Sequence, residues 1–303
     1  KANYIFVSNE NSDTITVLDK ETKKILKTLN TGGRPRDMKF NEDNSLLYIV
    51  VSEENEIVIL DTNSLKFTGK IAAGDDPEIF DIYSKLNLIA VSNEDDNQLT
   101  FIDINKKKKV STIENVGVEP EGVNFSPDGK YVYVTSEGTN SIIIVDVNKK
   151  SIVNEILVGN RPRRGIFVNE GNEYWVSNEL SGSVSVIDTK KQELIKTIDF
   201  RIKGIKDQNI TPVDFAYDLK NNIVYVTLGS ADHVAVVDSK KHEVLKNILA
   251  GKRVWGAALS SYSNELIVAN GNSDDISIID TKRLVSILSL PVGKTPHTVK
   301  IKK

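Results

Sequence analysis

Pairs of like-charged residues flank several of the prolines that recur along this chain. Each pair encloses one proline, and the sign of the charge changes along the chain. The pairs are Arg34 and Arg36, Asp76 and Glu78, Glu119 and Glu121, and Arg161 and Arg163. The chain has 31 lysines but only 8 arginines, so arginine at these places indicates a use for its planar guanidinium group. That group binds carboxylates and similar anions through two parallel hydrogen bonds.

The corresponding positions later in the chain bring other chemistry. Arg253 and Trp255 flank Val254, and His297 follows Pro296. One histidine with nearby carboxylates could bind a divalent cation, or act as an acid or base near neutral pH. The other two histidines, His233 and His242, fall in or beside turns, where we expect surface residues. None of the common hydrolase, metalloprotease, phosphate-loop or calcium-loop motifs is present.

An aspartate closes each of seven short apolar runs. These residues, Asp19, Asp61, Asp103, Asp146, Asp188, Asp238 and Asp280, follow one another at steps of 42, 42, 43, 42, 50 and 42 residues. Self-similarity at about 40 to 45 residues is typical of β-propeller blades. The sequence therefore predicts an all-β fold, a seven-bladed β-propeller of four-stranded antiparallel blades. We expect the aspartates to accept backbone N–H bonds in the turn after the third strand.

The two ends of the chain are predicted to complete one blade together. Residues 4–8 match the second strand of a blade, and residues 298–301 match a first strand. Sharing a blade removes the two open sheet edges that a ring of blades would otherwise leave. We expect residues 1–303 to form a single domain, with an insertion at about residues 200–210 between two blades.

The prolines precede the innermost strands, which line the centre of a propeller. Their charged neighbours should therefore form rings around one mouth of the central channel. In one interpretation, Arg36 pairs with Glu78 and Arg163 pairs with Glu121 across neighbouring blades, and these ion pairs only orient the loops. In the other, the mouth binds an anion, a charged ligand or a partner protein. Partly exposed ion pairs contribute only about 0–1 kcal/mol each, so stability is a weak reason for such a concentration.

A further carboxylate recurs nine residues before the repeated aspartate. It is present in four units, as Glu10, Glu94, Glu137 and Glu179. The surrounding Asn-Glu and Asn-Gly sequences suit tight turns. We therefore interpret these glutamates as solvated loop residues.

The composition argues against several classes of partner. A formal net charge of −3 disfavours nucleic acid and anionic membranes. No apolar stretch reaches the roughly 18 residues that a membrane span needs. The absence of cysteine removes disulfides, thiolate metal sites and cysteine nucleophiles. Because the chain starts at Lys1 rather than at a methionine, we expect that a leader or another N-terminal segment has been removed, and the sequence does not show which.

Several stretches resemble a known family of propellers. YVYVTSEG and VSVIDTKKQELIKTI resemble the YVTN repeat family, and the resemblance covers essentially the whole chain. The ordered series GGRPRD, DDPEIF, VGVEPEG, NRPRRGIFV and GKRVWGAAL is most similar to the β-propeller proteins associated with PQQ-dependent alcohol catabolism. That resemblance implies a periplasmic or otherwise exported, non-haem, non-catalytic protein working beside quinoprotein dehydrogenases and their cytochromes. It does not imply that this chain binds PQQ.

We predict a monomeric binding propeller that recognises a small charged ligand or a partner protein. The arginines would hold anionic groups, the glutamates would orient the arginines or meet a cation, and Trp255 would stack. The predicted site comprises Arg34, Arg36, Asp76, Glu78, Glu119, Glu121, Arg161, Arg163, Arg253, Trp255 and His297. We assign no catalytic residue and no cofactor, and a divalent cation at the mouth is compatible with these residues but not indicated by them.

Two other functions fit the same residues. The first is a lactonase-like or lyase-like propeller enzyme that uses His297 with a rim carboxylate and a divalent metal. The second is a structural, cell-surface repeat protein whose mouth binds nothing. Bound metal would favour the enzyme, and unchanged binding after Arg36 and Arg163 are replaced by lysine would favour the structural protein.

Overall fold

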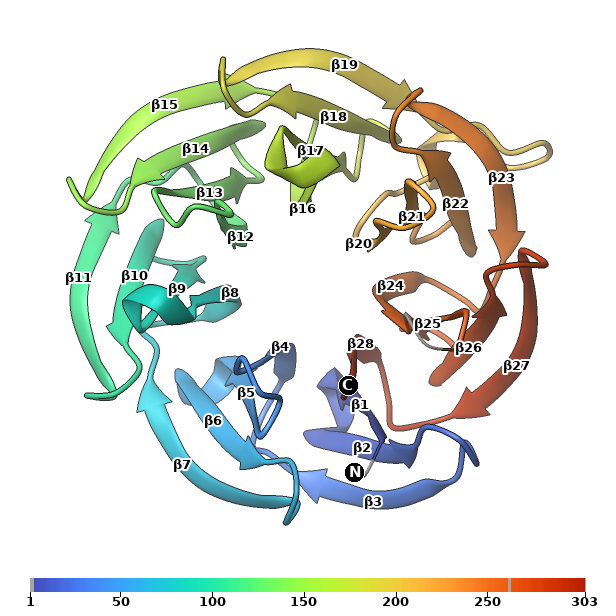
Figure 1. Cartoon of the computed structure of the whole chain (residues 1–303), viewed down its shortest axis with the longest axis horizontal. Helices are drawn as coiled ribbons and strands as arrows, with labels where there is room; N and C mark the ends of the chain where they lie inside the picture. Colours follow the sequence, from blue (N-terminus) through green and yellow to red (C-terminus); the bar gives the residue numbers. More distant parts are fainter. Residues whose placement is uncertain (1–2, 261–262, 303) are drawn as a thin grey trace.

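The computed structural model describes residues 3–260 and 263–302 of the chain. In this part of the chain, 28 strands form seven four-stranded antiparallel sheets, arranged as blades around a common centre (Figure 1). The predicted seven-bladed β-propeller is confirmed. Across these residues, we find no helix with the length and apolar character to cross a membrane.

Each blade places one strand next to the centre. In chain order these innermost strands are β4 (Pro35–Phe40), β8 (Pro77–Tyr83), β12 (Pro120–Phe125), β16 (Pro162–Val168), β20 (Phe215–Asp218), β24 (Val254–Ser260) and β28 (Pro296–Ile301). The second strands are β1 (Tyr4–Asn9), β5 (Leu46–Val51), β9 (Leu88–Asn93), β13 (Tyr131–Ser136), β17 (Glu173–Asn178), β21 (Ile223–Thr227) and β25 (Glu265–Asn270).

The two remaining strands of each blade lie further out. The third strands are β2 (Thr14–Asp19), β6 (Glu56–Asp61), β10 (Gln98–Asp103), β14 (Ser141–Asp146), β18 (Ser183–Asp188), β22 (His233–Asp238) and β26 (Asp275–Asp280). The outer strands are β3 (Ile25–Asn30), β7 (Lys66–Ala72), β11 (Lys108–Glu114), β15 (Ser151–Leu157), β19 (Glu193–Asp199), β23 (Glu243–Leu249) and β27 (Val285–Pro291). Short 3-10 helices occupy Glu10–Ser12, Ser52–Glu54, Ser84–Leu86, Asn169–Gly171 and Asp207–Asn209.

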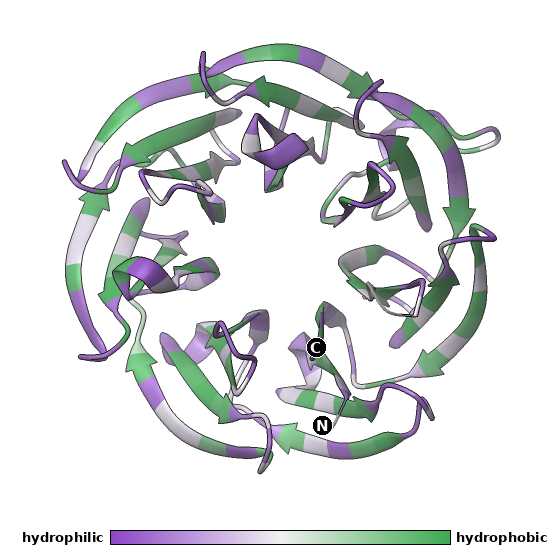
Figure 2. Ribbon diagram, viewed as in Figure 1, coloured by the Kyte–Doolittle hydropathy of each residue, from purple (hydrophilic) through white to green (hydrophobic). Residues whose placement is uncertain are grey.

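The core lies between neighbouring blades. Buried apolar side chains of the second and third strands form clusters that span adjacent sheets, as where Tyr133 of β13 packs with Tyr174 of β17. Full burial of one such large side chain contributes roughly 1.5–3 kcal/mol. Hydrophobic residues follow the strands, and hydrophilic residues fill most of the turns (Figure 2). The blades thus form a rigid frame for the loops around the centre.

The repeated aspartates cap turns, as the sequence predicts. Asp19 Oδ1 accepts hydrogen bonds from the backbone N–H groups of Glu21 and Thr22, at 3.0 and 2.7 Å. Asp280 caps the equivalent turn of the last blade in the same way. The hydrogen bonds from Thr22 hold the pKa of Asp19 below its usual value because they favour the charged form.

The ends of the chain share one blade, as expected. One sheet has the order β28-β1-β2-β3, and Val7 of β1 lies opposite Val299 of β28. Both valines are fully buried. The N and C termini therefore meet in the same blade (Figure 1).

The extra residues of the long repeat lie between β19 and β20. Ile210 of this connection is buried, and Ile202 and Ile205 pack against the core cluster around Trp175 and Phe215. Arg201 and the segment 206–209 are exposed. The connection therefore covers the core with its isoleucines and presents polar residues to solvent.

Candidate ligand-binding site at the channel mouth

The residue just before most innermost strands has a left-handed backbone. Positive φ angles occur at Arg34 (60°), Asp76 (40°), Glu119 (52°), Arg161 (54°), Arg253 (55°) and Thr295 (51°). This conformation is costly for residues other than glycine, and a following proline restricts the residue before it further. Such strain persists only where the surroundings enforce it. The loops of the mouth are therefore held by specific contacts.

An Asn or Asp side chain from the turn between the second and third strands supplies that contact. In each case its Oδ1 accepts a hydrogen bond from the backbone N–H of the strained residue. The pairs are Asp13 with Arg34 (3.1 Å), Asn55 with Asp76 (3.0 Å), Asn97 with Glu119 (3.0 Å), Asn140 with Arg161 (2.9 Å), Asp232 with Arg253 (2.8 Å) and Asp274 with Thr295 (2.8 Å). In the blade that carries the insertion, Gly182 stands at the corresponding place in its turn.

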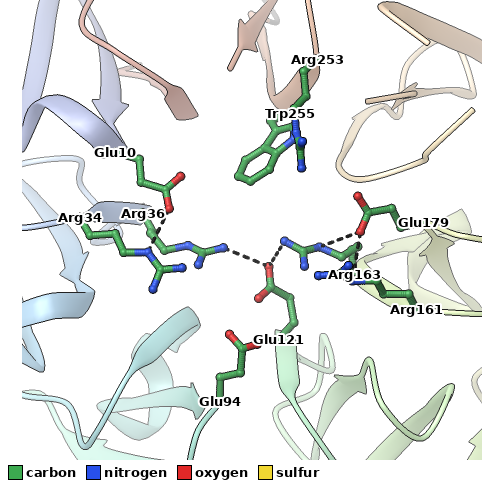
Figure 3. Close-up of a pocket in the computed structure, with 10 residues that line it drawn as sticks. All are labelled: Glu10, Arg34, Arg36, Glu94, Glu121, Arg161, Arg163, Glu179, Arg253 and Trp255. Carbon is green, nitrogen blue, oxygen red and sulfur yellow. Dashed lines mark hydrogen bonds and ion pairs between the residues drawn. The ribbon is translucent and has the colours of Figure 1, made fainter. Parts of the chain in front are cut away.

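A chain of ion pairs crosses the mouth. Glu121 lies between Arg36 and Arg163, with N–O distances of 3.7 and 3.0 Å (Figure 3). Arg36 also pairs closely with Glu78. Both pairs considered from the sequence, Arg36 with Glu78 and Arg163 with Glu121, are therefore present. All four of these side chains are buried.

Three of the four turn glutamates belong to the same network, so their interpretation as solvated loop residues was wrong. Glu10 accepts a hydrogen bond from Arg34 at 3.0 Å, and Glu179 lies 3.3 Å from Arg161. Glu137 is only 5% exposed and accepts hydrogen bonds from Arg161, at 2.7 Å, and from Arg163. In the sequence, the only indication of a shared role for these glutamates was their constant position, nine residues before the repeated aspartate.

Two charged side chains that line the space inside the mouth stay outside the network. In the described part of the chain, neither Arg253 nor Glu94 has an ion-pair partner. The guanidinium of Arg253 lies 5.0 Å from the ring centre of Trp255, which suits a cation–π contact. Arg253 and Trp255 lie on one side of the mouth and Glu94 lies on the other (Figure 3).

Burial controls the protonation of the carboxylates. It raises the pKa of Glu137 to about 7, although Arg163 and Arg161 oppose the shift. Burial also raises the pKa of Glu78 well above its usual value. At Glu121 burial acts in the same direction, but Arg163 and Arg36 outweigh it and lower the pKa. Of these three carboxylates, only Glu121 has surroundings that favour its charged form.

His297 lies beneath the mouth rather than in it. It is 1% exposed, and its ring meets the Trp255 ring edge-on at 4.8 Å. Its Nδ1 lies 3.0 Å from Thr298 Oγ1, and Arg164 Nη2 lies 3.4 Å from its Nε2. Burial and the nearby arginines lower its pKa well below the usual value, so the imidazole is neutral. Arg164 is a residue of this region that the site prediction did not include.

The mouth encloses a cavity of about 180 Å³. Seven predicted residues line it together with three of the turn glutamates, giving Glu10, Arg34, Arg36, Glu94, Glu121, Arg161, Arg163, Glu179, Arg253 and Trp255. Asp76, Glu78, Glu119 and His297 do not line it. Glu78 and His297 are buried, Asp76 is partly buried and Glu119 is exposed. The predicted residues thus gather at one mouth, but not all of them face the cavity.

Two groups of carboxylates have oxygens close enough to share a cation. The groups are Asp76, Glu78 and Glu94, and Glu94, Glu119 and Glu137, with ligand atoms within 4.8 Å of one another. Arg34 and Arg36 already pair with the first group, and Arg161 and Arg163 with Glu137. These arginines neutralise the charge that would attract a metal ion.

The other two histidines lie away from the mouth. His242 is partly buried, with Nε2 3.0 Å from Glu173 and its ring against Trp175. It therefore belongs to a packed cluster rather than to the free surface that the sequence suggested. The Nδ1 of His233 contacts the carbonyl oxygen of Ala231.

The fold is a seven-bladed β-propeller, and charged side chains surround one mouth of its central channel. Residues 83–303, more than two thirds of the chain, match the family model described as the cytochrome D1 heme domain. The chain belongs to this family. A search of curated proteins found no match. The more specific relation to PQQ-associated YVTN propellers stays a prediction.

Solved structures share the fold at low sequence identity. A functionally unknown protein from Desulfotomaculum acetoxidans has a TM-score of 0.84 and 15% identity, covering 99% of each chain. A Pseudomonas aeruginosa periplasmic gluconolactonase has a TM-score of 0.82 and 16% identity, again covering 99% of each chain. The dihydro-heme d1 dehydrogenase NirN has a TM-score of 0.75 and 14% identity, covering 99% of this chain and 75% of that one.

The expectation that this protein takes no cofactor is contradicted by its family, which is described as a heme domain. The mouth residues offer only part of what a haem needs. Its arginines suit the carboxylates that a haem carries, and a histidine is a common axial ligand of haem iron. However, both ring nitrogens of His297 already face polar partners, and ion-paired side chains line a cavity of about 180 Å³. These residues do not fit a haem ring inside the mouth.

Proposed function

We propose that the channel mouth binds a small polar ligand that carries a carboxylate group. The proposal rests on Arg253, which has no ion-pair partner in the described part of the chain. The other arginines that line the cavity pair with carboxylates of the protein, whereas Arg253 contacts the Trp255 ring. A ligand carboxylate would provide the planar, bidentate partner that this guanidinium lacks.

The residue on the opposite side of the mouth indicates which other group the ligand should carry. Glu94 lies across from Arg253 (Figure 3) and, where it is ionised, can only accept hydrogen bonds. A hydroxyl or ammonium group on the ligand would meet that requirement. The cavity, at about 180 Å³, is smaller than the roughly 300–1,000 Å³ typical of drug-sized ligands. A hydroxy acid or an amino acid fits this description.

We place this binding role in an exported protein. Support comes from the ordered loop series, from GGRPRD to GKRVWGAAL, which resembles the propellers associated with PQQ-dependent alcohol catabolism. In that setting the protein would act as a binding accessory to alcohol oxidation, beside a quinoprotein dehydrogenase or its cytochrome. The carboxylate would then belong to a small metabolite rather than to a haem, whose ring does not fit the residues of the mouth.

Lactone hydrolysis is the second candidate. Glu137, with a pKa of about 7, could serve as an acid or base near neutral pH. A gluconolactonase is among the proteins of similar fold. His297 is a weaker choice for that role because Trp255 and Arg164 enclose it.

Calorimetric titration with D-gluconate and with L-glutamate tests the binding proposal. For whichever acid binds, we expect Arg253→Gln to weaken binding at least tenfold and the exposed Arg283→Gln to leave it unchanged. A haemin titration is the second arm, and we expect no absorption change that depends on Arg253. Failure of both acids to bind, or equal binding by Arg253→Gln, would overturn the proposal, as would a haemin absorption change that is lost in Arg253→Gln. Gluconolactone hydrolysis that disappears in Glu137→Gln would replace it with the enzymatic candidate.

A further inference from the structure

A second cavity lies at the centre of the ring, beneath the mouth. It measures about 200 Å³, and we call it the lower cavity. All seven innermost strands or the residues just before them contribute to its lining, from Asp37 and Lys39 of β4 to Lys300 of β28. Arg164 lines this cavity and also lies 3.4 Å from His297. The Arg164–His297 contact therefore separates the lower cavity from the mouth.

The charges of the lower cavity are paired with one exception. Lys39 lies 3.8 Å from Asp37 and 3.9 Å from Asp81. Arg164 forms an ion pair with Asp214 at 3.1 Å. Lys300 is partly buried, and no described carboxylate lies within ion-pair distance of it. One positive charge at the centre of the ring is thus left without a direct partner.

The surroundings of Lys300 act against its positive charge. Burial lowers the pKa of its ammonium group, and Lys39 and Arg164 add to this effect. Asp37 and Asp214 attract the charge but do not compensate fully. A bound anion next to Lys300 would supply the missing partner and raise that pKa again.

Apolar residues form part of the remaining lining, beside Gly122, Asn124 and Gly165. They are Ile79, Val123, Ile166, Phe215 and Ala257, of which Ile79 and Val123 are almost fully buried. Inorganic anions gain nothing from such a surface, whereas a short aliphatic chain is removed from water by it. A combination of one unpaired cation and several aliphatic side chains matches a small carboxylic acid.

We propose that the lower cavity is a second binding site, for a small aliphatic carboxylate such as propionate. The carboxylate would pair with Lys300, and the aliphatic part would pack against Ile79, Val123 and Ile166. This site is independent of the one proposed at the mouth, because it shares none of the residues that line the mouth cavity.

Titration with sodium propionate, at an ionic strength held constant with sodium chloride, tests the second site. We expect Lys300→Met to weaken propionate binding at least tenfold. Lys282→Met, an exposed lysine in a hairpin turn, is the matched control and should bind as the parent does. Arg253→Gln should also leave propionate binding unchanged, so that failure of the mouth proposal and failure of this one are distinguishable.

The pH dependence provides a readout that a merely structural lysine would not give. Because the anion pairs with the protonated amine, we expect propionate affinity to fall as the pH rises through the pKa of Lys300. In a lysine-labelled NMR titration of the parent protein, propionate should raise that pKa, and this holds even if Lys300→Met fails to fold. Unchanged binding in Lys300→Met, a Lys300 resonance that ignores propionate, or equal competition by phosphate would overturn the proposal.

Discussion

At the scale of single residues, Arg163 organises the mouth. Its guanidinium lies against Glu121, Glu137 and Glu179. A buried arginine is tolerated only where carboxylates and hydrogen bonds replace its hydration. The sequence predicts the contact with Glu121, because both residues occupy the same place in neighbouring repeats. It does not predict Glu137, because the approach of that turn to the mouth depends on how the blades pack.

The protonation of Glu137 should make stability depend on pH. Its pKa in the folded protein, about 7, lies above the ordinary 4.5, so the folded state holds the proton more tightly than the unfolded state. Its contribution to stability is therefore fully present below about pH 4.5 and declines as the pH rises to about 7. The free energy of unfolding should fall over this range by on the order of 1–3 kcal/mol.

Glu137→Gln isolates this effect. Glutamine cannot titrate, so the difference in unfolding free energy between the two proteins should change between pH 4.5 and 7, in favour of the variant at the higher pH. Urea denaturation at several pH values measures it, with Glu155→Gln, an exposed residue of β15, as the control. Parallel pH profiles for the parent and Glu137→Gln would contradict the assigned protonation.

At the scale of elements, the connections between blades carry the site. Six of the seven are short loops whose strained residue is held by an Asn or Asp of the preceding turn. The prolines and their charged neighbours can be recognised in the sequence, but this hydrogen bond cannot. Its two partners are 21 or 22 residues apart, and an Asn in a turn is common without any such role.

Asn140 tests the importance of this hydrogen bond. Asn140→Ala removes the acceptor for the Arg161 N–H and places alanine at φ 55°. We expect it to lower the free energy of unfolding by about 1–3 kcal/mol. Asn140→Gly removes only the acceptor, since glycine adopts this backbone without strain, and should cost less.

The same denaturation experiment supplies the control. Asn148 is exposed in the turn after β14, and Asn148→Ala should change stability by no more than about 0.5 kcal/mol. If Asn140→Ala were as stable as the parent, the hydrogen bond would not be what holds the loop.

At the scale of the whole molecule, the ring was the most predictable feature. Seven units at nearly constant spacing specify seven blades, and the incomplete units at the two ends specify the closure. The cavities could not be predicted in the same way. They depend on which side chains from seven separate strands reach the centre, and the period of the repeat does not contain that information.

Removal of residues 296–303 tests the closure. This truncation deletes β28, which supplies the buried Val299 and pairs with β1. We expect a single unfolding transition with a melting temperature lower by on the order of 10 °C, because an open ring loses contacts on both sides of the gap. Calorimetry measures the transition, and an unchanged melting temperature would refute the closure.

The pairing of β1 with β28 also has a consequence for how the molecule is made. The ribosome delivers β1 first and β28 after all the other strands, so β1 stays without its neighbour for most of synthesis. An unpaired strand edge is a template for association with other chains. During synthesis the exposed edge of β1 is therefore the longest-lived site at which the unfinished ring can associate with other chains.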